Sequence, residues 1–434
     1  MNRVKQISQG NRPPHRPPIA FPVSRNKKRG LNNVAKRIHR IGYASVVVLS
    51  LFCTGCWDAA EINELGIVVA SGAELENPAD PQSAVKAYVQ VARPSQLAGG
   101  MSGGPSPSGN QKAFMLEEGT GPSAASALTT IQRRMSRRFF LRDRRVIVVG
   151  EAYAKRGLSD LLDEMIRNPD ARLRSYILVA HNTSLSKLLS LSYPLTRLPA
   201  DAMVELEESH QAVTINVVQF LKVLTGKSDP YAMGIRMLNT SSGNQGKIFG
   251  LDDVAVFKKD KMVGWLRGEA SRGFFWVQPQ SMHMRMNSMS IPIPGGGWLT
   301  SQLVVLNNVI LPSWGKSGPR FTINLEVTDD ILENMSRLKL DQPRDSKIAE
   351  RTIEREILKE IVLLLTELKK TYHADIVGLG DLLFARYPKQ WRTIEARWDQ
   401  VYSRMPIQIN VKVHIVRSGL IGDSVLNKST SQGR

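Results

Sequence analysis

Alternation between apolar and polar positions predicts β-strands along much of the chain. Residues 83–92 carry an apolar side chain at every second position, which is the pattern of a strand with one buried face. Apolar runs over 64–74, 144–150 and 175–180 predict further strands. A helical pattern that ends at Pro169 separates the last two runs. A strand, a helix and a strand in this order indicate an α/β first domain.

Two neighbouring segments within this first part have contrasting signals. Residues 93–122 are dominated by Gly, Pro and Ser, so we expect a flexible loop there. Ser123 follows directly and is a good N-cap residue, which predicts that a helix begins after it.

The middle of the chain combines one helical stretch with several strand patterns. Residues 201–225 predict helix, and 253–266 predict a β-hairpin with a Lys-rich turn between two apolar runs. Residues 274–278 and 282–291 are expected to continue the same sheet.

The last third of the chain shows the clearest patterns. Apolar runs over 303–311 and 321–327 predict strands, and 345–372 predicts a long helix with one apolar stripe. A second helix is expected over about 390–405, and 407–416 alternates as a strand. We expect one face of that strand to pack on the long helix and the other to face solvent.

Together these elements predict a mixed α/β (α+β) fold in three consecutive domains, each a mostly antiparallel or mixed sheet packed with helices. The predicted divisions are a basic extension and signal peptide over 1–56, an N-terminal α/β domain over 57–196, a middle domain over 197–296 and a C-terminal α/β domain over 297–434.

Composition narrows the class of protein. The chain has 434 residues, 42% of them apolar and 22% charged, which is ordinary for a globular protein. Its two Cys exclude a disulfide-stapled scaffold and a Cys-based zinc cluster. It lacks any run of about 18 uncharged apolar residues, which excludes a multi-pass membrane protein.

The net charge of +19 is concentrated at the front of the chain. Eleven Lys and Arg and no acidic residue occur up to Cys56, so a net charge of only eight remains for the rest. Residues 41–53 form an uncharged apolar stretch, and the small residues Thr54 and Gly55 precede Cys56. This order is typical of a bacterial lipoprotein signal, with Cys56 as the lipidated residue.

Cys53 is not suited to carry the lipid, because Phe52 would occupy the position that requires a small side chain. Cys53 itself stands where an aliphatic residue is usual, three positions before Cys56. An N-terminal transmembrane anchor that is never cleaved is the alternative to a lipoprotein signal.

Motifs of enzyme and metal sites are missing from the sequence. It contains no G-x-x-x-x-G-K-[ST] loop, no H-E-x-x-H and no G-x-S-x-G, and no two of its seven His are four positions apart. Met282, Met284 and Met286 with His283 could suggest a soft-metal site, but alternation places the three Met on one strand face, which favours a core. We therefore expect no catalytic residues, no metal and no cofactor beyond a covalent diacylglyceryl lipid on Cys56.

The basic runs over 133–138 and 142–145 are the most prominent charged feature after the signal. Arg133, Arg134, Arg137 and Arg138 could bind an anionic membrane surface, or could form the solvated end of a helix. Nucleic acid is disfavoured as a partner, because the chain carries an export signal and the remaining charge is modest.

Three blocks of sequence together resemble one known family. They are CWDAAEINELGIV at 56–68, the block over 142–180 with its strand, helix and strand, and the hairpin block over 250–268. In this order they resemble the Ger(x)C family, the C-subunit lipoproteins of spore nutrient-germinant receptors.

The resemblance implies a non-enzymatic subunit of three α/β domains that is required for the response to nutrient germinants. It would be lipid-anchored on the extracytoplasmic face of the spore inner membrane and assemble with A-type and B-type integral membrane subunits. Only Cys56 carries over as a functional residue.

Two other classes of protein are less compatible with the sequence. A solute-binding lipoprotein of a membrane transporter would show two similar lobes around a cleft, and three unlike segments argue against it. A secreted or cell-wall enzyme is disfavoured by the missing catalytic motifs.

Overall fold

The computed structural model of the chain describes residues 64–97, 112–209, 213–239, 247–281 and 288–417, and their strands form two sheets of nine and four strands. The predicted signal segment with Cys53 and Cys56 lies outside the described residues. The same is true of Met282, His283, Met284 and Met286, so the core interpretation of these Met stays a prediction.

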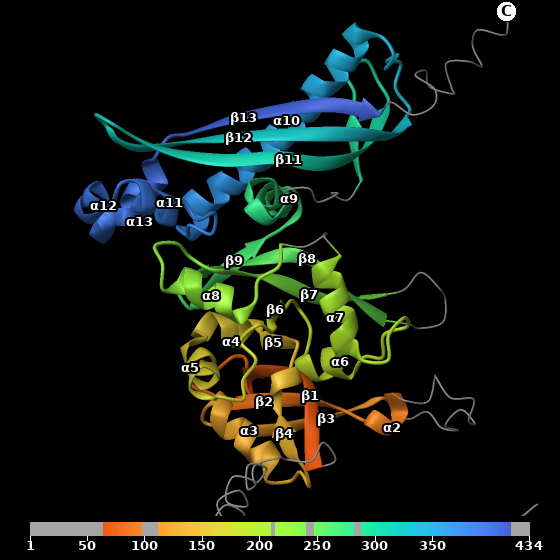
Figure 1. The fold of residues 1–434 in the computed structure, drawn as a ribbon, viewed down its shortest axis with the longest axis vertical. Helices are drawn as coiled ribbons and strands as arrows, with labels where there is room; N and C mark the ends of the chain where they lie inside the picture. Colours follow the sequence, from red (N-terminus) through yellow and green to blue (C-terminus); the bar gives the residue numbers. More distant parts are fainter. Residues whose placement is uncertain (1–63, 98–111, 210–212, 240–246, 282–287, 418–434) are drawn as a thin grey trace, which may run out of the picture. The chain divides into compact units, whose positions relative to one another are not determined.

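The nine-stranded sheet has the order β3-β2-β1-β5-β6-β7-β8-β9, and β4 also pairs with β1 (Figure 1). Strands β1, β5, β6 and β7 run parallel to one another, and the outer strands are antiparallel. The strands are β1 (Leu65–Leu75), β2 (Val85–Ala92), β3 (Phe114–Gly121), β4 (Arg138–Phe140), β5 (Val146–Gly150), β6 (Tyr176–Ala180), β7 (Tyr231–Asn239), β8 (Lys247–Lys258) and β9 (Lys261–Leu266).

Helices cover both faces of this sheet. A Cβ atom on Gly119 would contact α3, whereas one on Gly72 would contact α6, and these two glycines lie on opposite faces. The Ser123 hydroxyl accepts a hydrogen bond from the Ser126 amide at 3.3 Å, so the predicted N-cap is confirmed. The helices are α2 (Pro94–Leu97), α3 (Ala124–Gln132), α4 (Glu151–Arg156), α5 (Ser159–Arg167), α6 (Leu185–Ser190), α7 (Pro199–Glu208) and α8 (Val217–Leu224).

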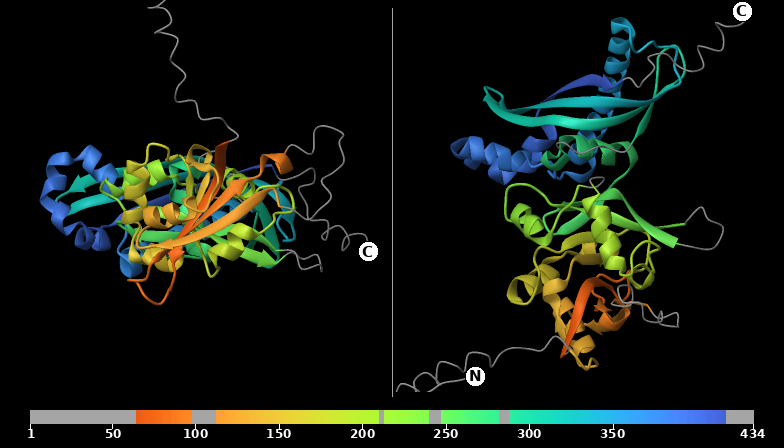
Figure 2. Two further views of the ribbon diagram at one scale, coloured as in Figure 1. Left: turned by 90° about the horizontal axis from the view of Figure 1, so that it is seen from below. Right: turned by 45° about the vertical axis from the view of Figure 1, so that its right-hand side comes forward.

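The four-stranded sheet has the order β10-β11-β12-β13, and its β11–β12 hairpin is recognisable in Figures 1 and 2 as two long strands joined by a tight turn. Strand β13 pairs in parallel with β12, so the connection between them crosses over through α10. Its strands are β10 (Met289–Pro292), β11 (Trp298–Gly315), β12 (Gly318–Asn334) and β13 (Ile407–Arg417), and the helices that follow β12 are α10 (Pro343–Glu367), α11 (Leu379–Arg386), α12 (Pro388–Ile394) and α13 (Trp398–Arg404).

The long helix and the last strand are confirmed. Ile353, Ile357 and Ile361 of α10 are fully buried, as the apolar stripe predicts. A π-helical turn over Leu368–Tyr372 extends α10 to the predicted end. On β13, Val413 is buried while Gln408 is exposed, in agreement with the alternation.

Helix α9 (Gly268–Val277) corrects the strand expected over 274–278. All but three of its residues are buried, so its apolar positions show no helical period, and a short apolar run of this kind does not distinguish a buried strand from a buried helix. Gly273 allows α9 to approach α10 closely, since a Cβ there would lie 2.3 Å from the Glu360 carbonyl oxygen.

The predicted mixed α/β class is confirmed. The division of strands between sheets differs from the expectation, which was one sheet in each predicted domain. Strand β6 pairs with β7 through Leu178 and Met233, so one sheet continues across the predicted boundary at 196/197. Strand β3 also corrects the loop expected over 93–122, because this Gly-containing segment is held as a strand by its pairing with β2.

A buried polar contact joins the loop before β7 to the loop before α11. Asp229 and Asp375 exchange two hydrogen bonds of 2.9 Å, one from each backbone amide. The Asp375 carboxylate also accepts hydrogen bonds from the amides of Gly378, Leu379 and Gly380. This carboxylate therefore fixes the turn into α11.

Candidate functional site

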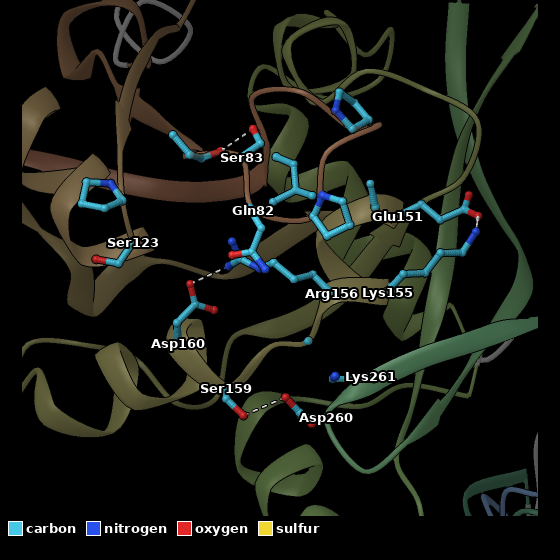
Figure 3. A pocket seen from close by; sticks show the side chains of 17 residues that line it. Gln82, Ser83, Ser123, Glu151, Lys155, Arg156, Ser159, Asp160, Asp260 and Lys261 are labelled. Carbon is cyan, nitrogen blue, oxygen red and sulfur yellow. Dashed lines mark hydrogen bonds and ion pairs between the residues drawn. The ribbon is translucent and has the colours of Figure 1, made fainter.

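A cleft of about 1240 Å³ lies beside the carboxyl ends of β1 and β5 (Figure 3). From β1 the chain continues to β2 on one side, while β5 pairs on the other, so the strand order runs outward in both directions from this point. Crevices at such a reversal, outside the carboxyl ends of parallel strands, are the usual ligand sites of α/β sheets. The cleft is lined by the turn between β1 and β2, the start of α3, helix α4, the start of α5 and the β8–β9 turn.

Arg156 is held in place on one wall of this cleft. Its Nη2 donates to Asp160 Oδ2 at 2.7 Å, and its guanidinium lies 4.6 Å from the centre of the Tyr153 ring. The Tyr153 hydroxyl donates to the other Asp160 oxygen at 2.8 Å. Burial, together with the Asp160 charge, raises the pKa of Tyr153, so this phenol stays a neutral donor. Tyr153 and Asp160 thus fix the guanidinium in one orientation.

The β8–β9 turn also lines the cleft and contacts the α4–α5 turn. The Ser159 hydroxyl donates to Asp260 Oδ2 at 2.7 Å, and the Leu158 amide donates to the Asp260 carbonyl at 3.0 Å. Gly157 has a φ of +128°, and a Cβ there would lie 2.7 Å from Asp260 Oδ2. A glycine is therefore required where the α4–α5 turn meets the hairpin.

Each carboxylate that lines the cleft already accepts a hydrogen bond. Some donor groups of the lining, in contrast, have no partner among the described residues. Glu151 accepts from Lys155 at 2.6 Å, and Asp160 and Asp260 are engaged as described above. Among the described residues, neither the Gln82 side-chain amide nor the Lys261 ammonium has a hydrogen-bond or ion-pair partner. The cleft can therefore offer hydrogen bonds to an acceptor.

The predicted arginines are brought together on the surface after α3. We call Arg133, Arg134, Arg137 and Arg138 the basic surface, and all four are exposed. Arg138 begins β4 and pairs with Leu65, the first residue of β1. Asp170 lies 3.4 Å from Arg138 and so offsets part of the charge.

The second basic run does not join this surface as a whole. Arg142 is exposed and contacts Asp170 at 2.8 Å, and Arg145 contacts Asp201 at 2.6 Å. Arg144 is only 1% exposed, and burial lowers its pKa. The sequence pattern of this run gives no sign that one of its arginines is buried.

A buried polar cluster surrounds His181, which follows β6. Its Nδ1 lies 2.7 Å from Asp253, its Nε2 lies 3.0 Å from Arg267, and its ring stacks on Trp265 at 4.3 Å. Arg267 can only donate, so Nε2 accepts and Nδ1–H faces Asp253. Sequence reasoning treats His181 as a lone residue because its partners are far away in the chain.

Within the described parts of the chain, three or more His, Cys, Asp or Glu are nowhere grouped in a way that suits a metal ion. Over the same residues, every helix is too short or too polar to cross a membrane.

Comparison with known proteins identifies two consecutive family domains. The spore germination protein N-terminal domain matches residues 58–237, and the spore germination B3/GerAC-like C-terminal domain matches 252–419. The boundary between the two matches falls near the β7–β8 connection, within the nine-stranded sheet.

Individual relatives match along nearly their whole length. Spore germination protein KC of Bacillus subtilis (strain 168) is 26% identical over 401 residues, which cover 87% of this chain and 94% of that protein. Spore germination protein GerQC of Bacillus cereus is 21% identical over 379 residues, covering 86% and 98%. The crystal structure of the GerBC protein matches with a TM-score of 0.47 and 17% identity, covering 83% of this chain and all of that one. With both domain models matched in order across the described fold, the chain belongs to the GerAC-like family of spore germination proteins.

Proposed function

We propose that the chain is the lipid-anchored, non-catalytic C subunit of a spore nutrient-germinant receptor, required for the response to nutrient germinants. It assembles with A-type and B-type integral membrane subunits on the extracytoplasmic face of the spore inner membrane. The observation that carries this proposal is the position of the N-terminal family match, which begins at residue 58, directly after Cys56 and its signal-like sequence. The relatives named above are spore germination proteins over nearly their whole length.

A tether at Cys56 would keep the first strand close to the membrane. Leu65, the first residue of β1, follows Cys56 by nine residues. A fully extended chain spans at most about 3.5 Å per residue, so Leu65 lies within roughly 32 Å of the lipid site. A diacylglyceryl group supplies two chains, the number that stable membrane anchoring requires.

The basic surface is suited to contact the bilayer next to this tether. Arg138 pairs with Leu65 at the start of β1, the described strand nearest to Cys56 in the sequence, and this supports such a contact. Near an anionic membrane each arginine contributes about 1 kcal/mol, and this attraction decays within about 8–10 Å at physiological salt. We therefore propose anionic lipid as the partner of Arg133, Arg134, Arg137 and Arg138.

A transporter's solute-binding lipoprotein is a weaker alternative. The described residues form two sheets with different strand numbers and orders. They do not form the two similar lobes that such a protein would have.

The tether is tested by exchanging each cysteine in turn. In the Cys56→Ala strain we expect loss of the protein from the spore membrane fraction and an impaired nutrient response, measured by immunoblot and by nutrient-triggered germination. The Cys53→Ala strain is the matched control and should retain both. Equal membrane retention of both variants would instead support an uncleaved anchor.

Subunit assembly is tested by affinity capture of the tagged protein from solubilised spore membranes. We expect A-type and B-type subunits to be recovered with it and identified by mass spectrometry. Recovery of transporter permease components in their place would favour the solute-binding alternative.

The membrane contact is tested with a dye beside the basic surface. Ser136→Cys lies between the four arginines, and Ser317→Cys lies at the exposed β11–β12 turn as a control. The lipoprotein is placed in phosphatidylcholine vesicles that contain phosphatidylglycerol. We expect the fluorescence emission of an environment-sensitive dye at position 136 to shift to the blue and that of the dye at position 317 to stay unchanged. Phosphatidylcholine alone, high salt or exchange of the four arginines for Gln should abolish the shift. A shift that persists under these conditions would contradict an electrostatic contact.

A further inference from the structure

We propose that the cleft in Figure 3 binds a small solute through a carboxylate group, with Arg156 and Lys261 as its donors. This inference goes beyond the proposed function and does not depend on lipid anchoring or on receptor assembly.

The location of the cleft favours a ligand over a structural gap. It lies at the carboxyl ends of two adjacent parallel strands, at the point where the strand order reverses. Its volume of about 1240 Å³ exceeds the roughly 300–1000 Å³ of a typical small-molecule site. A small solute would therefore occupy only the part of the cleft around its anchoring groups.

Arg156 is prepared to bind a planar anion. Its guanidinium carries five N–H donors, and the described residues that engage it are Asp160 and Tyr153, so N–H groups remain for a ligand. The Tyr153 ring and Asp160 fix its orientation before a ligand arrives. A carboxylate matches the guanidinium in shape and can accept two parallel hydrogen bonds from it.

Lys261 adds a positive charge to the lining of the cleft. A Cβ on Gly157, the residue after Arg156, would lie 3.4 Å from Lys261 Cγ, so the lysine stem runs past this turn. The Lys261 ammonium has no partner among the described residues. The Gln82 side-chain amide also lines the cleft and is a further donor (Figure 3).

The acidic groups of the cleft do not compete strongly with such a ligand. Glu151, Asp160 and Asp260 each accept a hydrogen bond from Lys155, Arg156 or Ser159. These hydrogen bonds reduce the repulsion between the three carboxylates and an anionic ligand. The hydroxyls of Ser123 and Ser159 also line it and can bind polar groups elsewhere on the solute.

The test uses the full-length lipoprotein in detergent, with disodium succinate as the probe. Binding is measured by isothermal titration calorimetry up to about 10 mM ligand. We expect saturable binding of succinate and none of dimethyl succinate, which has the same skeleton without the charges. Lys261→Gln should weaken the affinity about tenfold, the effect of losing one charged hydrogen bond. Arg156→Gln should weaken it at least as much.

One control and the choice of a second test variant keep the result interpretable. Lys316→Gln removes an exposed lysine from the β11–β12 turn and should leave the affinity unchanged. Lys261 is exposed and its ammonium has no partner among the described residues, so its variant remains informative even if Arg156→Gln unfolds. Absence of succinate binding, equal binding by the Lys261 and Lys316 variants, or binding of inorganic phosphate in preference to succinate would each overturn the proposal.

Discussion

Carboxylates serve opposite purposes in two regions of this molecule. In the cleft beside β1 and β5, the Asp160 side chain is 31% exposed and holds a guanidinium that still has free donors. In the part that contains α10 and α11, Asp375 and Glu360 are each 1% exposed and are surrounded by donors. The partly exposed carboxylate leaves neighbouring groups able to bind something else, whereas the buried ones use their hydrogen bonds to join segments of the chain.

The buried carboxylates connect segments that are distant in sequence. Glu360 accepts from Arg272 and from the Trp276 indole, both at 2.7 Å, and so links α10 to α9. Asp375 links the loop after α10 to Asp229 and to the start of α11. Because a buried charge without its partners is very costly, stability should depend much more on these groups than on those of the cleft.

The largest effect is expected from Asp375→Ala. It removes the acceptor of three backbone amides in a buried turn, which should lower the free energy of unfolding by about 3 kcal/mol or more. Urea denaturation of the protein measures this change. Asp341→Ala, at an exposed position, is the control and should stay within about 0.5 kcal/mol of the unchanged protein. A similarly small effect at Asp375 would remove the contrast between the two regions.

Asp329→Asn should alter how stability depends on pH. Burial raises the pKa of Asp329 to about 7, and the nearby Asp330 charge adds to this, while the Ser301 hydroxyl donates to its Oδ2 at 2.8 Å. Between about pH 4 and 7 the Asp329 carboxyl is protonated in the folded chain but ionised in the unfolded chain. The stabilisation that results from the raised pKa is therefore complete below about pH 4 and is lost as the pH rises through about 7.

The decline in the free energy of unfolding should approach about 1.4 kcal/mol per pH unit at its steepest. Asp329→Asn should flatten it, as urea unfolding at several pH values between 4 and 8 would show. An unchanged slope in the variant would mean that Asp329 does not keep its proton in the folded chain.

The smallest effect on stability is expected in the cleft. Asp160→Ala removes a partly exposed ion pair and leaves the buried Tyr153 hydroxyl without its acceptor, which should cost about 1 kcal/mol. The same urea measurement applies, with Asp163→Ala as the control, since its pair with Arg167 is well exposed. A loss as large as that of Asp375→Ala would show that the cleft network also serves mainly to hold the fold together.

Sequence patterns predicted helices and strands well where one face of the element is buried and the other is exposed to solvent. The α10 stripe and the alternation of β13 are of this kind, and both are observed. The pattern failed at α9, which is buried almost all round, and at β3, whose Gly-containing sequence forms a strand only because β2 pairs with it. In both cases tertiary contacts outweigh the local preference.

The candidate site was less accessible to sequence reasoning than the fold. The exposed arginines of the basic surface follow from a local run of charge. The cleft instead combines Gln82, Arg156 and Lys261 from three distant segments that only the sheet order brings together. The sequence pattern within one segment does not predict that these three segments lie close together.

The sequence by itself predicted an export-type leader with Cys56, and it determined the mixed α/β class, the family resemblance and the basic run, because each depends on residues that are close in the chain. Only the tertiary structure decided that Arg144 is buried while Arg138 is exposed, that one sheet spans the first two predicted domains, and that a donor-rich cleft opens where the strand order reverses. The physical reason is that burial and pairing depend on which distant strands become neighbours, and the pattern within one segment does not specify its neighbours.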